Sequence, residues 1–409
     1  MATELDLTAA TAALKQRFAP DAMKLLVYQK NPFFAALKKQ ENMGGNNLKV
    51  PVRLGINQGQ SSVFSTAQTN AYAPNFKAFE ITRDSYYTVA QISGETVAST
   101  KGDLNAFVDL VALELSDSLL SHTDDLAGQL FRDGTGSIGS ISALPGSGVI
   151  TLTEPDDVTQ FEVGQVLQAR IAGGGALRAA LGYVISVNRP AGTVTVASSG
   201  QGGAGADPNL WAPTDDLLIQ GTNNAVISGL AAWLPTTAPG GSDNFFGVNR
   251  SQDRSRLAGV VYDGTGMTIQ QALINGFALG SREGAEPDMG FCSYDTFAAL
   301  VNELGSKVQY TNPQATTLGG IPFKGLELYA NHGTIKIMPD RSCQSGVVYG
   351  LTMSSWALAS AGGAPMVDEF GQGMWLRQSS ADGYELRVKS YAQLYCNAPG
   401  HNVKVLVTV

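Results

Sequence analysis

Residues 46–100 predict an extended two-stranded ribbon, and this ribbon constrains the fold more than any other part of the sequence. Apolar and polar side chains alternate in two runs, the first containing Leu48, Val50 and Val52, and a period of two is typical of strands with one buried face. A polar stretch, residues 55–74, separates the runs, and we expect it to form a mobile tip. Because an isolated two-stranded ribbon is only marginally stable in water, the chain needs a further surface to hold it.

The segments on either side of the ribbon are predicted to be helical. Residues 1–45 contain an apolar stripe interrupted by prolines, so we expect a broken amphipathic arm that needs a neighbour to cover it. Residues 103–132 are the clearest helix, with Asp103 as a candidate N-cap, apolar side chains at helical spacing, and Asp133–Gly134 as the stop signal. Such a helix would span roughly 45 Å.

The rest of the chain predicts a β unit followed by a mixed region, so the whole belongs to the α+β class. Residues 138–222 contain short strands between glycine-rich turns and favour a small barrel or sandwich. In residues 223–409, Thr268 caps a predicted helix through Leu279, and Ser293 starts another. The predicted strands of this region are Leu326–Tyr329, Ile335–Met338, Val347–Leu351, Trp375–Arg377, Tyr384–Tyr395 and Val403–Val409.

Composition excludes some classes of function. Lys plus Arg total 27 against 35 Asp plus Glu, a net charge of −8, which argues against a protein that grips nucleic acid by its phosphates. A charged fraction of 15% with 47 glycines suits a chain whose surface is largely covered by other chains. The N-terminus lacks the pattern of a signal peptide and no apolar run approaches the length of a membrane span, so we expect cytosolic synthesis and no membrane partner.

No pattern predicts a catalytic, cofactor-binding or metal site. Gly134–Gly139 spells G-x-G-x-x-G, but a helix precedes it and strands follow, the reverse of the dinucleotide-binding order, so we interpret it as a glycine linker. Cys396 and His401 are the only close Cys/His pair, whereas a zinc site needs a second pair of ligands. We expect His122 on the polar face of the long helix, and the three scattered cysteines predict no disulfide framework.

Three acidic doublets are further candidates for a cation site. Adjacent acids are more often solvated or capping residues, and that is our prediction here. The doublets are Asp124-Asp125, Asp156-Asp157 and Asp215-Asp216.

The order of arm, extended hairpin, long helix and mixed α+β domain resembles the major capsid proteins of tailed bacteriophages with the HK97-type fold. Four stretches are similar to that family in their local amino-acid sequence: Ile227–Trp233, Asp243–Arg250, Leu304–Tyr310 and Leu376–Gly383. The resemblance implies five parts: the N-terminal arm at 1–45, the E-loop at 46–100, the spine helix of the P domain at 101–137, an inserted barrel-like β domain at 138–222, and the remainder of the P domain with the A domain at 223–409.

The resemblance implies a structural protein without enzymatic activity, which assembles into the pentamers and hexamers of an icosahedral head shell around double-stranded DNA. The implied partners are copies of itself, portal and scaffolding proteins, a decoration protein in some cases, and DNA contacted non-specifically. The implied location is the virion, after synthesis in the cytoplasm of a host bacterium. The N-terminal scaffold that is usually cleaved in this family is missing, so either scaffolding is a separate protein or the sequence begins near a processing site. The starting Met1 favours the separate protein. The expected inter-subunit contacts are Phe18, Phe33, Phe34, Lys77, Phe79, Arg83, Tyr86 and Tyr87.

Some members of the family cross-link a lysine of the E-loop to an asparagine of a neighbour. Lys77 and Asn397 have suitable chemistry, although no motif places the glutamate that assists. Two alternatives stay open: an encapsulin-like compartment shell of the same fold, and a soluble carbohydrate-binding or hydrolytic protein. The second needs paired carboxylates in a cleft, and the sequence shows no convincing pair. We expect residues 138–222 on the outer face of a shell, since an insertion of this size would obstruct the lumen.

Overall fold

The computed structural model describes residues 31–74, 76–95, 104–144, 146–200, 203–208, 210–304, 317–318, 321–322, 325–330, 333–368, 375–378 and 382–409. These residues belong to two compact units. The smaller unit contains Tyr87–Asp124 and Pro365–Lys389, and the larger contains Gln29–Tyr86, Asp125–Ala364 and Ser390–Val409.

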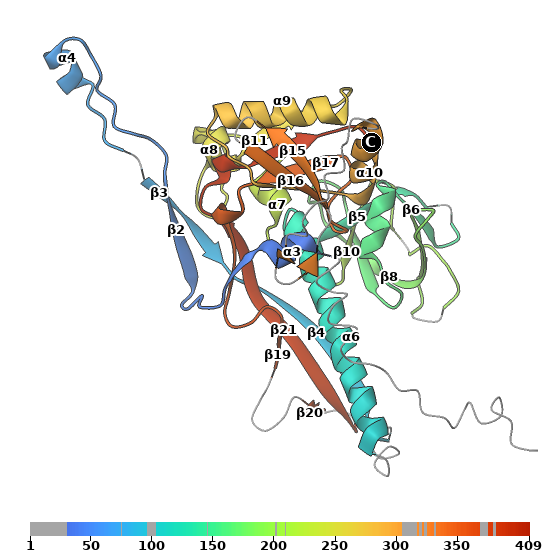
Figure 1. Ribbon diagram of the computed structural model, residues 1–409. Helices are drawn as coiled ribbons and strands as arrows, with labels where there is room; N and C mark the ends of the chain where they lie inside the picture. Colours follow the sequence, from blue (N-terminus) through green and yellow to red (C-terminus); the bar gives the residue numbers. More distant parts are fainter. Residues whose placement is uncertain are drawn as a thin grey trace, which may run out of the picture. The chain divides into compact units, whose positions relative to one another are not determined.

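The predicted ribbon is present in the larger unit. Strands β2 (Asn47–Arg53) and β3 (Phe76–Thr82) pair antiparallel, with Val50 opposite Phe79. The connection between them carries the short helix α4 (Phe64–Thr69), which Figure 1 draws at the end of the ribbon. The second predicted run is two strands rather than one, because a separate strand, β4, follows Arg83 and pairs elsewhere. The ribbon therefore ends at Thr82 and not near residue 100.

The described part of the predicted arm packs on its own chain. Helix α3 (Pro32–Ala36) begins with a proline, which the first turn of a helix tolerates because its N–H has no partner there. Strand β1 (Lys38–Gln40) then runs parallel to β18 (Trp356–Ser360). The expectation that the arm needs a neighbour is therefore wrong for these residues, while residues 1–30 lie outside the described part.

The long helix is confirmed as α6 (Leu104–Phe131). It ends where Gly134 adopts a φ of 82° and Asp133 Oδ1 accepts a hydrogen bond of 3.0 Å from the Thr135 amide. The glycine-rich stretch after it is a connection only over Gly134–Gly136. Ser137–Gly139 already belong to the strand that begins at Ser137, so the prediction of a glycine linker is wrong for these three residues. None of the helices in the described ranges is both long enough and apolar enough to span a membrane.

The following strands close into a barrel in the order β10-β5-β6-β9-β8-β7, and this decides between the barrel and the sandwich that the sequence left open. The barrel has its own apolar core, which includes Phe161 and Trp211, and the 3-10 helix η1 (Pro155–Gln160) lies between two of its strands. The strands are β5 (Ser137–Ala143), β6 (Val149–Leu152), β7 (Val166–Arg170), β8 (Leu177–Asn188), β9 (Thr193–Ala197) and β10 (Asp216–Ile219).

The second half of the larger unit is a six-stranded mixed sheet in the order β11-β22-β17-β12-β16-β15. Helices α9 (Ile269–Arg282) and α10 (Tyr294–Leu304) share an apolar core with it. Thr268 and Ser293 accept backbone hydrogen bonds at the starts of these helices, as the capping patterns predict. The strands are β11 (Val260–Asp263), β12 (Met289–Cys292), β15 (Leu326–Ala330), β16 (Gly333–Pro339), β17 (Val347–Leu351) and β22 (Val403–Leu406).

The remaining elements are short. They are the helices α7 (Leu230–Trp233) and α8 (Arg254–Ala258), the 3-10 turns η2 (Arg250–Gln252), η4 (Met353–Ser355) and η5 (Pro399–His401), and the paired strands β13 (Thr317–Leu318) and β14 (Ile321–Pro322).

The long strand β21 (Gly383–Cys396) contributes to both units. In the smaller unit its first residues pair with β19 (Met366–Val367) and β20 (Trp375–Arg377). Strand β4 (Asp84–Ser93) also pairs with β21. In the larger unit the last residues of β21 pair antiparallel with β18.

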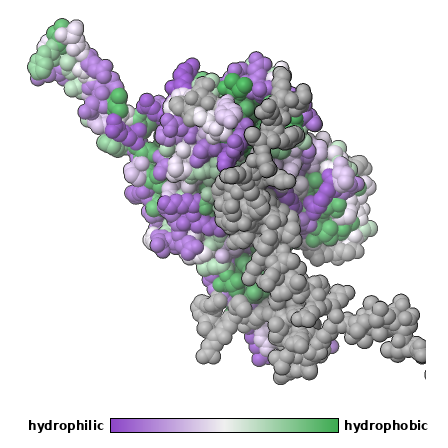
Figure 2. Space-filling view, in the orientation of Figure 1, coloured by the Kyte–Doolittle hydropathy of each residue, from purple (hydrophilic) through white to green (hydrophobic). Residues whose placement is uncertain are grey.

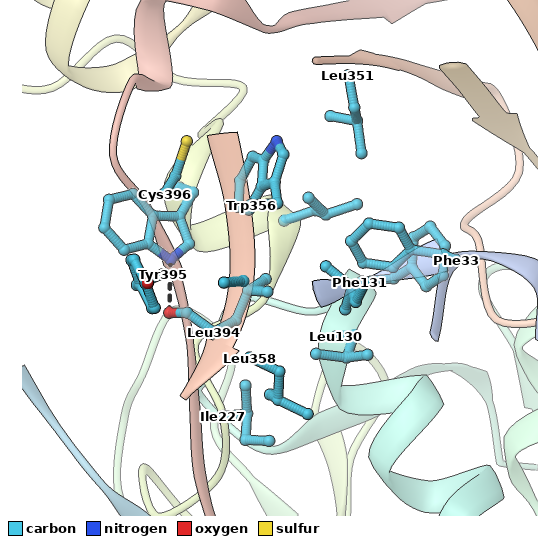
Figure 3. Close-up of a cluster of buried hydrophobic side chains, with 14 of the residues drawn as sticks. Phe33, Leu130, Phe131, Ile227, Leu351, Trp356, Leu358, Leu394, Tyr395 and Cys396 are labelled. Carbon is cyan, nitrogen blue, oxygen red and sulfur yellow. Dashed lines mark hydrogen bonds between the residues drawn. The ribbon is translucent and has the colours of Figure 1, made fainter. Parts of the chain in front are cut away.

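A central core joins segments of the larger unit that are far apart in the sequence. Phe33 of α3, Phe131 of α6, Leu351 of β17 and Leu394 of β21 converge there (Figure 3). The indole nitrogen of Trp233 donates a hydrogen bond of 3.2 Å to the carbonyl oxygen of Leu394. The ribbon and the described arm are positioned by this core.

Candidate functional site

The β2–β3 ribbon has one face anchored on its own subunit. Val50, Val52, Phe79 and Ile81 are at most 9% exposed and belong to the central core. Phe79 meets Trp233 edge-on, with ring centroids 5.1 Å apart. These positions alternate along the two strands, so one face of the ribbon is buried and the other is left outside.

The outer face of this stem carries charge. Lys49 and Glu80 form an exposed ion pair of 2.8 Å between paired positions of the two strands. Arg53 and Lys77 are also exposed. These four are the charged residues between 47 and 82, so the ribbon is basic on a chain that is acidic overall.

The tip, defined here as residues 54–76, exposes large apolar side chains. Between Arg53 and Lys77 the sequence has no charged residue. Figure 2 shows apolar atoms gathered at this end of the ribbon. The exposed fractions lie between 53% and 76% for Ile56, Val63, Phe64, Tyr72 and Phe76. Exposed apolar patches mark sites of protein–protein contact, and burying one such side chain is worth about 1.5–3 kcal/mol.

The outer edge of strand β2 is unsuited to pairing with a further strand. Within the described ranges β2 pairs with β3 alone. Pro51 lies in β2 and has no N–H to donate, and Lys49 and Arg53 flank it. Proline and charged side chains are the usual means by which proteins block such edges. Contact through the ribbon is therefore a matter of its side chains, chiefly those of the tip.

Three of the expected contact residues lie in the interior of their own subunit. Phe33, Phe34 and Phe79 are 0%, 3% and 0% exposed. Phe33 packs against Phe131 and Phe291, each at 5.2 Å between ring centroids. The expectation that these three side chains face a neighbour is corrected: they pack where the ribbon and the arm cross the central core.

The other expected contact residues differ in their surroundings. Arg83 donates hydrogen bonds of 2.9 and 2.7 Å to the carbonyl oxygens of Met43 and Gly45 and so ties the end of β3 to the arm. The Tyr86 hydroxyl donates to Asp125 at 2.9 Å, and burial together with this carboxylate raises the Tyr86 pKa. Lys77 and Tyr87 are exposed and stay proposed contacts. Phe18 lies outside the described residues.

The sequence pattern does not predict the exposed apolar residues of the tip, because polar residues dominate the stretch 55–74. Its apolar residues follow neither a helical nor a strand period, so no pattern singled them out. The signal that was present is the complete lack of charge over the tip, which is unusual for a solvated loop.

The acidic doublets mostly bind arginines. Asp215 is 2% exposed, so the expectation of solvated or capping acids is wrong for it. The ion pairs are Arg132 with Asp157 at 2.5 Å, Arg178 with Asp215 at 2.9 Å and Arg170 with Asp216 at 2.9 Å. In the part of the chain that the structure describes, no three His, Cys, Asp or Glu side chains are grouped to hold a metal ion.

His122 and the three cysteines are buried. His122 is fully buried rather than on a polar face, and burial lowers its pKa to about 4. Cys292, Cys343 and Cys396 are free and buried, and burial raises the pKa of Cys292 and of Cys396 to about 12. A thiol with so high a pKa is not a thiolate at neutral pH.

No protein-family model matches the sequence, and no curated protein matches it either. Solved structures, in contrast, are similar to it in fold. The capsid asymmetric unit of cyanophage A-1(L) is 12% identical, with a TM-score of 0.52 over 96% of this chain and 94% of that one. The capsid of Myoviridae phage XM1 is 8% identical, with a TM-score of 0.44 over 97% and 94%. The holo-SrpI encapsulin complex of Synechococcus elongatus PCC 7942 is 9% identical, with a TM-score of 0.44 over 99% and 96%.

The likeness to the cyanophage capsid covers nearly the whole of both chains at a TM-score above 0.5. The mixed α+β chain therefore has the HK97-like fold of tailed-phage capsid proteins, and the resemblance seen in the sequence is confirmed at the level of the fold.

Proposed function

We propose that this chain is the major capsid protein of a tailed bacteriophage, which assembles into pentamers and hexamers and encloses double-stranded DNA in an icosahedral shell. The observation that carries the proposal is the uncharged, apolar tip of the β2–β3 ribbon on a chain with a capsid fold. In this proposal the ribbon is the E-loop, α6 is the spine helix and the barrel is an inserted domain on the outer face.

The ribbon is built to reach a second copy. Its buried face fixes the stem on its own subunit, so little order is lost when the tip docks. The tip supplies apolar area, and the basic stem is attracted to a chain whose net charge is −8. Each contact is modest, but a closed symmetric lattice repeats it at every subunit.

Electron microscopy and size-exclusion chromatography of the recombinant chain test the proposal. We expect closed shells, tubes, or discrete pentamers and hexamers. A monomer that unfolds in one cooperative transition and never assembles would contradict a shell function.

A variant of the tip tests the contact itself. Phe64 is 76% exposed, so Phe64→Ser removes apolar area from the tip without opening a cavity. We expect soluble subunits with the wild-type melting temperature and at least a tenfold rise in the concentration needed for assembly, measured by light scattering.

The matched control is Val163→Ser, on the barrel, where the side chain is 65% exposed. This variant should assemble like the wild type. If Phe64→Ser does so too, the tip is not a subunit contact.

The finer parts of the proposal concern partners. Portal, scaffolding and decoration proteins, and DNA held without sequence specificity, are the partners expected for a phage shell in a virion. Nuclease-protected DNA inside purified particles supports this function, whereas a protein cargo in its place supports a compartment shell.

A further inference from the structure

A pocket of about 500 Å³ lies in the larger unit, lined by residues from the end of α6, the segment after α7, and β22. Its volume falls within the roughly 300–1,000 Å³ typical of small-molecule sites. Three basic side chains line it, Arg132, Arg250 and Lys404, together with Thr236. Asp133 also lines the pocket and is exposed.

Lys404 is the unusual residue of this pocket. It is 2% exposed, and its Nζ donates a hydrogen bond of 2.7 Å to Thr236 Oγ1. The nitrogen also lies 5.4 Å from the centre of the Tyr349 ring. Among the described residues it has no ion pair with a carboxylate within 4.0 Å. Lysine is almost never this buried unless it is paired, because an uncompensated charge in the interior is costly.

Two neighbours of Lys404 have buried polar atoms without a hydrogen-bond partner. Arg250 is satisfied by Asp243 at 3.0 Å and by the Ala232 carbonyl oxygen at 2.7 Å. Arg132, in contrast, uses one terminal nitrogen for both Asp157 and the Ile138 carbonyl oxygen, and its buried Nε has no partner. The buried Tyr349 hydroxyl also has no partner. Unsatisfied buried groups of this kind call for a bound ion or water.

We propose that this pocket binds a small oxyanion, a phosphate or a carboxylate, on the ammonium group of Lys404 beside Arg132. Both side chains line the pocket, both have donors to spare, and an oxyanion supplies acceptors for these donors. Asp133 is the carboxylate in the lining and acts against the binding of an anion. The source is either free phosphate or a carboxylate group, and both present the same chemistry to Lys404.

The charge of Lys404 makes the binding depend on pH. Burial lowers the pKa of Lys404 to about 8, and the charges of Cys343 and Asp133 act against this shift. Arg132, Arg250 and Tyr349 are the other ionisable groups nearby. A bound anion stabilises the ammonium form, so affinity should fall about tenfold for each pH unit above 8.

Isothermal titration calorimetry on the full-length chain tests the proposal. Sodium phosphate and sodium acetate are titrated separately at pH 7, with sodium chloride holding the ionic strength constant. Tighter binding of phosphate identifies a free phosphate site, and binding of acetate at least as tight as that of phosphate identifies a carboxylate site.

Lys404→Met keeps the length and the apolar stem of the side chain and should weaken binding at least tenfold. The matched control is Lys38→Met, which removes an exposed lysine of β1 and should bind like the wild type. Wild-type affinity at pH 7 and pH 9 is a second measurement that needs no variant. Equal binding by Lys404→Met, or no binding of either anion by the wild type, would overturn the proposal.

Discussion

The imidazole ring of His122 is fully buried within the smaller unit, where its Nδ1 lies 2.9 Å from Thr88 Oγ1. Burial lowers its pKa from 6.5 to about 4, so the folded chain holds this ring neutral. The unfolded chain binds a proton there below pH 6.5, and the folded chain does so only near pH 4. The contribution of His122 to stability is therefore present above pH 6.5 and is lost as the pH falls toward 4.

We predict that His122→Gln abolishes the loss of folding stability that His122 causes at low pH. Between pH 7 and pH 4 the free energy of unfolding of the wild type should fall by about 3 kcal/mol relative to the variant. Urea unfolding at several pH values measures the free energy of unfolding of both proteins. The contributions of the other titrating groups are the same in both and cancel when the two values are subtracted. His401→Gln removes an exposed histidine and should leave the profile unchanged. Parallel profiles for the wild type and His122→Gln would contradict the prediction.

At the scale of elements, helix α9 packs unusually close to strand β22. A Cβ at Gly276 would lie 2.6 Å from Val405 Cγ2, and Gly280 faces Val403 in the same way. Glycine lowers helix stability by about 1 kcal/mol relative to alanine. Close packing against the sheet is therefore the physical reason for glycine at these two positions.

We predict that Gly276→Ala destabilises the chain although it favours the helix. Overpacking costs about 1–3 kcal/mol, and the gain in helix propensity of about 1 kcal/mol offsets part of it, so the free energy of unfolding should fall by up to about 2 kcal/mol. Gln271→Ala, at an exposed position of the same helix, should change stability by less than about 0.5 kcal/mol. A Gly276→Ala variant that is more stable than the wild type would show that the helix can move away from the sheet.

At the scale of the whole molecule, the barrel enters and leaves the rest of the larger unit at one place. Its first and last strands, β5 and β10, are neighbours. The Asn224 amide donates a hydrogen bond of 3.1 Å to the Thr135 carbonyl oxygen, just outside those strands. The barrel core is also a separate apolar cluster. These features are typical of a unit inserted into a continuous fold.

We predict that replacing residues 137–221 with a short Gly-Ser linker leaves a chain that still folds. The chain loses the ion pair from Arg132 to Asp157 and the hydrogen bond from Arg341 to Thr159, so stability should fall by about 1–3 kcal/mol. Chemical unfolding followed by circular dichroism checks this result. Loss of cooperative unfolding would contradict it, and a folded chain that no longer forms shells would give the barrel a role in assembly.

The sequence by itself determined most of the longer helices and strands, because one-sided burial leaves a periodic pattern in the chain. The long helix α6, the capped helix α9 and the strands of the mixed sheet follow from that pattern. The order of these elements also pointed to the capsid fold. Such signals are local, since a cap or an alternation involves residues a few positions apart.

Only the tertiary structure decided which apolar side chains are covered. Phe33 and Phe64 are chemically identical, yet the first is 0% and the second 76% exposed. Phe33 is enclosed because its amide binds Asp340 at 3.1 Å and its ring packs on Phe291, both far along the chain. The burial of His122 and of Lys404 likewise could not be predicted from the sequence. A side chain's exposure depends on partners that folding brings together from distant positions, and no local pattern in the sequence records them.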